Sequence, residues 1–113
     1  MEVRDSSYRV WYDASTSTVF FEGSLRLGTA EYEPISRLLD QVVELRPAHL
    51  TLNMLDLSFC NSSGINTLYK FAINLRKLGA TQVMVRGSAA IAWQQKSLGN
   101  LKKFLPTIEI DVQ

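Results

Sequence analysis

Serine and asparagine residues gather in one short segment, Asp56-Leu57-Ser58-Phe59-Cys60-Asn61-Ser62-Ser63-Gly64-Ile65. The residues before it, 50–57, form a nearly continuous apolar run that predicts a strand covered on both faces. A helix is predicted to follow, with Asn61 as its N-cap and Ser62 and Ser63 in its first turn. A phosphate at such a helix start gains roughly 0.3–2 kcal/mol from unpaired backbone N–H groups. The segment therefore fits a phosphorylatable serine, although a plain helix cap is the commoner use of these residues.

A longer stretch, Leu52-Asn53-Met54-Leu55-Asp56-Leu57-Ser58-Phe59-Cys60-Asn61-Ser62-Ser63-Gly64-Ile65, resembles the signature of STAS domains. The name stands for sulphate transporter and anti-sigma factor antagonist. The family pattern is a hydrophobic strand, Asp-Leu-Ser, two variable residues, Asp-Ser-Ser-Gly, and then Leu or Ile opening a helix. The stretch matches this pattern in order and spacing. The chain length and the order of predicted elements also resemble a stand-alone anti-sigma factor antagonist.

The resemblance implies that Ser62, the first serine of the pair, is phosphorylated, and that Ser63 is a secondary candidate. We expect Ser58, Asn61, Ser63 and Gly64 to form the partner-binding surface around it, with Gly64 leaving room for close backbone approach.

The implied partners are an anti-sigma-factor-like serine kinase and a PPM-type serine phosphatase. The implied function is an anti-sigma factor antagonist in a partner-switching pathway that regulates transcription. The alternative is a STAS-fold regulator of a different target, such as a second-messenger enzyme.

Two residues depart from the family pattern. Asn61 stands where the family usually has Asp, so the capping oxygen is kept and the negative charge is lost. Arg26 follows Gly23-Ser24-Leu25, in a loop where many members carry an acidic residue. Both departures lie where we expect partner contacts, so they bear on partner choice.

Other chemistry finds little support in the sequence. His49 is the only histidine, so a zinc site is not expected and no metal or cofactor is predicted. Cys60 has no basic neighbour in sequence and is predicted to be a small buried hydrophobe. A small α/β hydrolase with Ser62 as nucleophile is the rival interpretation, but no Gly-x-Ser-x-Gly elbow surrounds that serine. We therefore predict no catalytic residues.

Composition narrows the partners further. The chain has 113 residues, with 12 Lys plus Arg against 11 Asp plus Glu. This balance gives no electrostatic footprint for nucleic acid or for an anionic membrane, so neither is an expected direct partner. A single cysteine fits a reducing cytosol, and the sequence starts without a secretory leader, so we expect a cytoplasmic protein.

The pattern of the whole chain predicts one STAS-like domain over residues 1–113, because no repeat or linker interrupts it. Alternating or β-branched segments predict strands at 8–12, 18–22, 50–57, 83–85 and 108–112. Apolar residues at helical spacing predict helices at 35–43, 61–78 and 91–105, the last weakened by Gly99. The predicted fold is α/β, a mixed sheet of four to five strands in a single layer flanked by about three main helices.

The last predicted helix carries Trp93-Gln94-Gln95-Lys96 and Lys102-Lys103. These residues fit a solvated face with Trp93 packed at its edge. They also fit a partner contact, because aromatic residues flanked by charge are common at interfaces.

Overall fold

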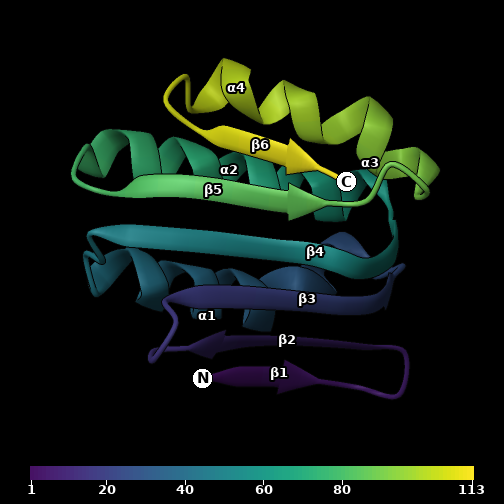
Figure 1. The fold of residues 1–113 in the computed structure, drawn as a ribbon. Coiled ribbons are helices and arrows are strands. Elements are labelled where there is room, and N and C mark those ends of the chain that lie inside the picture. The colour runs from purple at the N-terminus through teal and green to yellow at the C-terminus, as the bar shows by residue number, and fades with distance from the viewer.

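A sheet of six strands runs through the protein, and each strand lies beside its neighbour in the chain (Figure 1). The computed structural model describes residues 1–113. The strands are β1 (Glu2–Arg4), β2 (Tyr8–Asp13), β3 (Thr18–Leu25), β4 (His49–Cys60), β5 (Gln82–Gly87) and β6 (Glu109–Val112). The first three pair antiparallel, and β3 to β6 pair parallel. The predicted α/β fold with a mixed sheet is confirmed, but the predicted count of four to five strands is too low.

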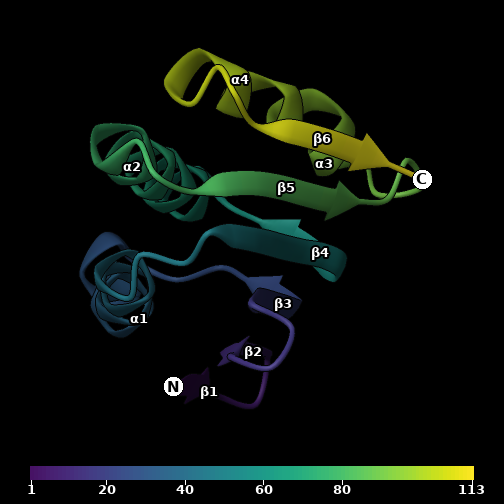
Figure 2. The same cartoon turned by 60° about the vertical axis from the view of Figure 1, so that its left-hand side comes forward.

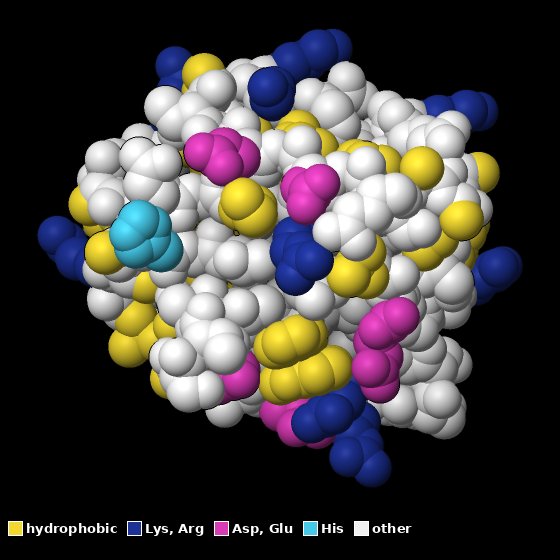
Figure 3. All heavy atoms as spheres, in the orientation of Figure 1, with side chains coloured by type: hydrophobic (Ala, Val, Ile, Leu, Met, Phe, Trp, Pro, Cys, Tyr) yellow, Lys and Arg dark blue, Asp and Glu magenta, His cyan; other side chains and the backbone are white.

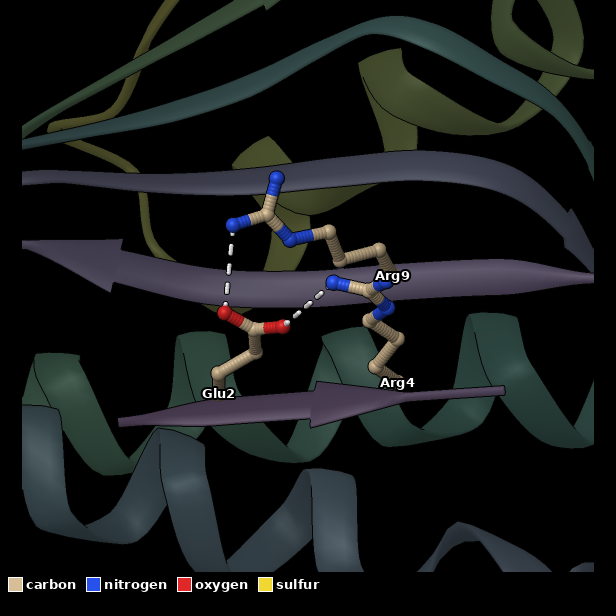
Figure 4. A network of polar contacts seen from close by, with 3 residues as sticks. All are labelled: Glu2, Arg4 and Arg9. Atoms are coloured by element: carbon tan, nitrogen blue, oxygen red, sulfur yellow. Dashed lines mark hydrogen bonds and ion pairs between the residues drawn. The ribbon is translucent and has the colours of Figure 1, made fainter. Parts of the chain in front are cut away.

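The strand missing from the prediction is β1. It has only three residues, and Glu2 and Arg4 are charged, so it shows neither a β-rich run nor readable alternation. Pairing with β2 creates it, with Val3 opposite Val10. Figure 4 shows the Glu2 carboxylate between two arginines, 3.1 Å from Arg9 and 3.8 Å from Arg4. Exposed ion pairs contribute only about 0–1 kcal/mol each, so the strand depends mainly on its pairing with β2.

The helices are η1 (Thr29–Tyr32, a 3-10 turn), α1 (Glu33–Glu44), α2 (Ser62–Leu78), α3 (Ala92–Ser97), η2 (Leu98–Asn100, also 3-10) and α4 (Leu101–Phe104). Two of them, α1 and α2, follow the predicted segments closely, whereas η1 lies outside them. Pro34 lies in the first turn of α1, and α2 ends at Gly79, whose φ of 72° is left-handed. The last helix is broken by η2, which contains Gly99, so α3 and α4 replace the single predicted helix.

The helices α1 and α2 lie on the same face of the sheet (Figures 1 and 2). The parallel strands are added in one direction, so right-handed crossovers return to the same side each time. In β4, Leu50, Leu52 and Met54 point to this covered face and are buried, whereas Thr51 and Asn53 between them are only half-buried. The prediction that this strand is covered on both faces is therefore wrong.

Two irregularities interrupt the alternation of β4, the first within the apolar run of residues 50–57 and the second directly after it. Phe20 pairs with Asn53, but Glu22 pairs with Asp56, so β4 holds one extra residue there. A second extra residue, Ser58, follows before Phe59. Each β-bulge shifts the alternation by one position, which hides the two-residue period of a strand that is buried on one face only.

The open face of the sheet carries a mixed surface (Figure 3). Trp11 stacks on Phe20 with 4.8 Å between ring centroids, and the Arg9 guanidinium lies 3.9 Å from the centroid of the Trp11 ring. Such cation–π contacts contribute about 0.5–1 kcal/mol at exposed sites. Aromatic and charged residues together thus shield part of the face that no helix covers.

Side chains of α3 complete the hydrogen bonding of β4. The pairing of β5 with β4 stops at Asn53, so the carbonyls of Met54 and Leu57 have no partner strand on that side. The Gln94 Nε2 donates to both carbonyls, at 2.6 and 3.0 Å, and its Oε1 accepts from the Ser88 N–H at 2.7 Å. The Trp93 indole N–H also donates to the Leu57 carbonyl, at 2.9 Å.

Trp93 is half-buried and Gln94 is fully buried. The solvated-face interpretation fits Gln95, Lys96, Lys102 and Lys103, which are exposed, and Trp93 at the edge, but Gln94 belongs to the core.

We expect Gln94→Leu to lower the free energy of unfolding by about 2–4 kcal/mol, because the Met54 carbonyl and the Ser88 N–H lose this partner and the Leu57 carbonyl keeps only the Trp93 indole N–H. Gln95→Leu is the matched control, since Gln95 is exposed on the same short helix, and its cost should stay below about 1 kcal/mol. Urea unfolding of both variants measures the difference. Equal losses would show that the Gln94 contacts do not hold the end of β4.

Candidate functional site

The turn from β4 to α2 is built around Asn61. This residue has extended backbone angles, φ −78° and ψ 175°, and its side-chain Oδ1 accepts from the Gly64 N–H at 3.0 Å. The contact satisfies one of the N–H groups left unpaired at the start of a helix. The predicted N-cap is confirmed, and Ser62 is the first residue of α2.

Asn61 also ties this turn to the segment that follows β3. Its backbone N–H donates to the Leu25 carbonyl at 3.0 Å, and its side-chain Nδ2 donates to the Leu27 carbonyl at 2.8 Å. The Tyr32 hydroxyl donates to Asn61 Oδ1 at 2.6 Å. Two donors thus meet the amide oxygen and one acceptor meets the amide nitrogen, which fixes the orientation of the amide. An ionised aspartate could accept the same two bonds but could not donate to Leu27.

Tyr32 and Gly64 close the inner side of the turn. Tyr32 is only 3 % exposed, and burial raises the pKa of its hydroxyl to about 12. A Cβ atom at Gly64 would lie 2.6 Å from the Tyr32 hydroxyl and 2.5 Å from the Cys60 Sγ. The room expected at Gly64 is therefore used inside the protein, where Tyr32 and Cys60 occupy it. Sequence reasoning missed Tyr32, because nothing near it in sequence points to Asn61.

The two serines at the start of α2 have different surroundings. Ser62 is exposed, and its hydroxyl makes no hydrogen bond within the chain, whereas Ser63 is half-buried and shares a 3.1 Å hydrogen bond with the Thr29 hydroxyl. The first turn of α2 holds no acidic residue. Negative charge added at Ser62 would thus meet unpaired N–H groups and no like charge in its own turn.

Ser58 lies on the sheet side of the same turn. It is exposed, it is the extra residue of the second bulge, and its hydroxyl donates to the Gly23 carbonyl at 2.9 Å. A groove of about 540 Å³ lies on the other side, between η1, α1, α2 and α4, and Ser63 lines it together with Thr29 and Lys70. The start of α2 therefore has an exposed rim at Ser58 and Ser62 and a recess at Ser63.

The remaining candidates give no reactive centre. His49 is exposed at the first residue of β4 and Ser62 lies two residues beyond its last residue, so the two are at opposite ends of a 12-residue strand and cannot form a nucleophile–base pair. No group of three or more His, Cys, Asp or Glu could hold a metal ion. Cys60 is buried as predicted, and burial raises the pKa of its thiol to about 12. None of the helices has the length and apolar character that crossing a membrane requires.

Residues 13–112 match the STAS domain family. The chain belongs to this family. The match spans nearly the whole sequence and includes the turn at Asn61, so the resemblance read from the motif is confirmed. No curated protein matches the sequence.

Three solved structures share the STAS fold of this chain. One is the diguanylate cyclase SiaD in complex with its activator SiaC from Pseudomonas aeruginosa, with a TM-score of 0.74, 10% identity, and coverage of 100% of this chain and 99% of that chain. The others are SiaC of Pseudomonas aeruginosa (TM-score 0.72, 10% identity, coverage 100% and 96%) and apo-SiaC from the same organism (TM-score 0.70, 11% identity, coverage 100% and 98%).

These similarities correct the expected partners. SiaC is the activator of a diguanylate cyclase, and neither an anti-sigma-factor-like serine kinase nor a PPM-type serine phosphatase is the partner seen in these structures. The prediction of those two partners is therefore wrong. SiaC is thus tied to a second-messenger enzyme rather than to transcription.

Substitution of Asn61 should reveal how much each of its hydrogen bonds contributes. We expect Asn61→Ala to lower the free energy of unfolding by about 2–3 kcal/mol, because the cap and two buried contacts are lost. Asn61→Asp keeps the two accepted bonds and loses only the donated one, so its loss should be about 1 kcal/mol. Urea unfolding gives both values, with Asn66→Ala as an exposed control on α2. An Asp variant as stable as wild type would show that the Leu27 contact contributes nothing.

Cys60 should make the protein sensitive to alkali. The thiol pKa is raised from 9.0 to about 12, so the folded state holds a proton that the unfolded state releases. Its stabilising effect is complete below about pH 9 and is lost as pH rises toward 12. Between pH 8 and pH 10.5, wild type should lose about 1–2 kcal/mol more stability than Cys60→Ala. Urea unfolding at both pH values tests this, and parallel losses in the two proteins would refute it.

Proposed function

We propose that this protein is a non-catalytic regulator that binds and controls a second-messenger enzyme of the diguanylate cyclase class. The observation that carries the proposal is the full-length similarity to the structures of SiaC, the activator of a diguanylate cyclase. At 10% identity this likeness establishes the fold alone, so the target is our inference. This proposal replaces anti-sigma factor antagonism with the alternative given in the sequence analysis, a regulator of a second-messenger enzyme.

We further propose that Ser62 is the phosphorylation site that controls binding. Its free, exposed hydroxyl at the start of α2 supports this choice, whereas the Ser63 hydroxyl is already engaged with Thr29. Phosphorylation adds roughly −1.5 to −2 charges. Burying that charge against a partner without a cation costs several kcal/mol, and about 1.4 kcal/mol is already tenfold in affinity.

The proposed partner surface is the rim of Ser58 and Ser62 with the recess at Ser63 beside it. Asn61 and Gly64 act from beneath this surface, because Asn61 fixes the turn and Gly64 is buried. In this proposal residues 1–113 work as one domain in the cytoplasm, where the buried thiol of Cys60 stays reduced.

The test is an activity and binding assay against the diguanylate cyclases of the source organism, each purified. Cyclic di-GMP formation from GTP is measured with the unmodified protein, with protein carrying phosphoserine at position 62, and with Ser62→Ala. At least one cyclase should respond to the unmodified protein and to Ser62→Ala. We expect the phosphoprotein to bind that cyclase at least about a hundredfold more weakly, which corresponds to about 2.8 kcal/mol.

Gln41→Glu is the charge control, because it places a negative charge on an exposed site of α1, away from the start of α2. It should leave the affinity unchanged, while Ser62→Asp should weaken it. No response from any cyclase would contradict the proposed target. Equal affinity of the unmodified and phosphorylated proteins would contradict the role of Ser62.

A further inference from the structure

Arg26 directly follows Leu25, which pairs with Cys60 two residues before Ser62, and it has no carboxylate partner. The ion pairs of the chain involve Arg4, Arg9 and Arg37, and Arg26 is in none of them. Its guanidinium instead lies 4.1 Å from the centroid of the Phe59 ring, and its Nε donates to the Ser24 hydroxyl at 3.2 Å. Both contacts are made by an exposed side chain to groups without charge, so Arg26 forms no ion pair.

The backbone around Arg26 is held against the residue that precedes Ser62. Leu25 pairs with Cys60 in the sheet, and the carbonyls of Leu25 and Leu27 both accept hydrogen bonds from Asn61. Arg26 stands between these two anchored residues, next to Asn61. Its long side chain therefore starts from a fixed point close to the start of α2, and its end is held only by the exposed contacts with Phe59 and Ser24.

We infer that Arg26 is the internal counter-charge of phosphorylated Ser62: on modification its guanidinium leaves Phe59 and pairs with the phosphate. The inference rests on the proposed phosphorylation of Ser62 and names how the modified state is recognised within the chain. Arginine suits this role because its planar fork matches phosphate oxygens and keeps its charge at all relevant pH values.

The move of Arg26 from Phe59 to the phosphate is favoured because the contacts it gains are stronger than the contacts it loses. Arg26 gives up an exposed cation–π contact and one neutral hydrogen bond. It gains charge-assisted hydrogen bonds, which are roughly twice as strong as neutral ones and are frequently bidentate between arginine and phosphate. The phosphate also meets the N–H groups at the start of α2, so two separate elements hold it.

The exchange would change two features of the proposed partner surface at once. The phosphate adds negative charge at Ser62, and the departure of Arg26 uncovers the ring of Phe59, one residue from Ser58. A partner residue that had faced the positive guanidinium would then face an uncharged aromatic ring of different shape. Arg26 stands where many family members carry an acidic residue, so this mechanism would be a property of this chain rather than of the family pattern.

Nuclear magnetic resonance of the full chain tests the inference, with phosphoserine placed at position 62 during synthesis. In the unmodified protein, the ring of Phe59 should shift the side-chain proton signals of Arg26 upfield, and this shift should disappear in the phosphoprotein. The phosphorus signal should titrate about half a pH unit lower in the phosphoprotein than in its Arg26→Gln variant, with Arg26→Lys in between. Arg76→Gln, at the far end of α2, is the control and should not move the titration.

The other charged groups on the elements around the start of α2 are the same in all these proteins. They include Glu22 and Asp56 on the sheet, Glu31 and Glu33 on η1 and α1, Lys70 on α2 and Lys96 on α3. A titration unchanged by Arg26→Gln, with the Arg26 signals still upfield after phosphorylation, would overturn the inference. These measurements need no partner protein. If no cyclase binds, the proposed function is refuted, but the pairing of Arg26 with the phosphate can still be observed. If a phosphate-sensitive cyclase is found, the pairing of Arg26 can still be refuted by these spectra.

Discussion

The side-chain amide of Asn61 holds together the segments that form the candidate site. Its oxygen receives the Gly64 N–H and the Tyr32 hydroxyl, and its nitrogen donates to the carbonyl of Leu27. Through these contacts the end of β4, the start of α2 and the chain between β3 and α1 are fixed to one residue. Ser62 is exposed, while the side chain of Asn61 before it points inward. The backbone of Arg26 is held near Asn61, because the carbonyls of Leu25 and Leu27 both accept hydrogen bonds from Asn61.

The sheet supplies the frame in which this anchor works. Strands added in one direction place α1 and α2 on one face, so their apolar sides and the inner face of the sheet form one core. The end of β4 runs beyond β5, and Gln94 and Trp93 take over the hydrogen bonding that a longer β5 would have provided. The strand that leads into the candidate site is thus held on one side by β3 and on the other by side chains of α3.

The similarity to SiaC shows how little sequence identity this arrangement requires. At 10% identity the folds match over the whole chain, because the order of strands and helices and the burial pattern carry the fold. In the function proposed above, binding depends on particular side chains at the start of α2. In this chain those include an asparagine in place of the usual aspartate and an arginine where an acidic residue is common. Both differences change the charge carried by the segments that meet at the turn from β4 to α2.

The sequence by itself determined the elements whose signals are local. Apolar spacing and Pro34 gave α1, Asn61 and Gly79 bounded α2, and alternating strands and helices indicated a partly parallel sheet. These signals act within a few residues, so they can be read without knowing the rest of the chain. The same holds for the position of Ser62 at a helix start.

Only the tertiary structure decided which groups meet across long stretches of chain. The contact of Tyr32 with Asn61 spans 29 residues, and the contacts of Gln94 with β4 span 37 and 40. Two bulges hid the one-sided burial of β4, and the three residues of β1 became a strand only by pairing with β2. The inward position of Gly64 likewise follows from Tyr32 and Cys60 packing against it. Such contacts depend on the closed fold, in which hydrogen-bond donors find acceptors that no local pattern in the sequence specifies.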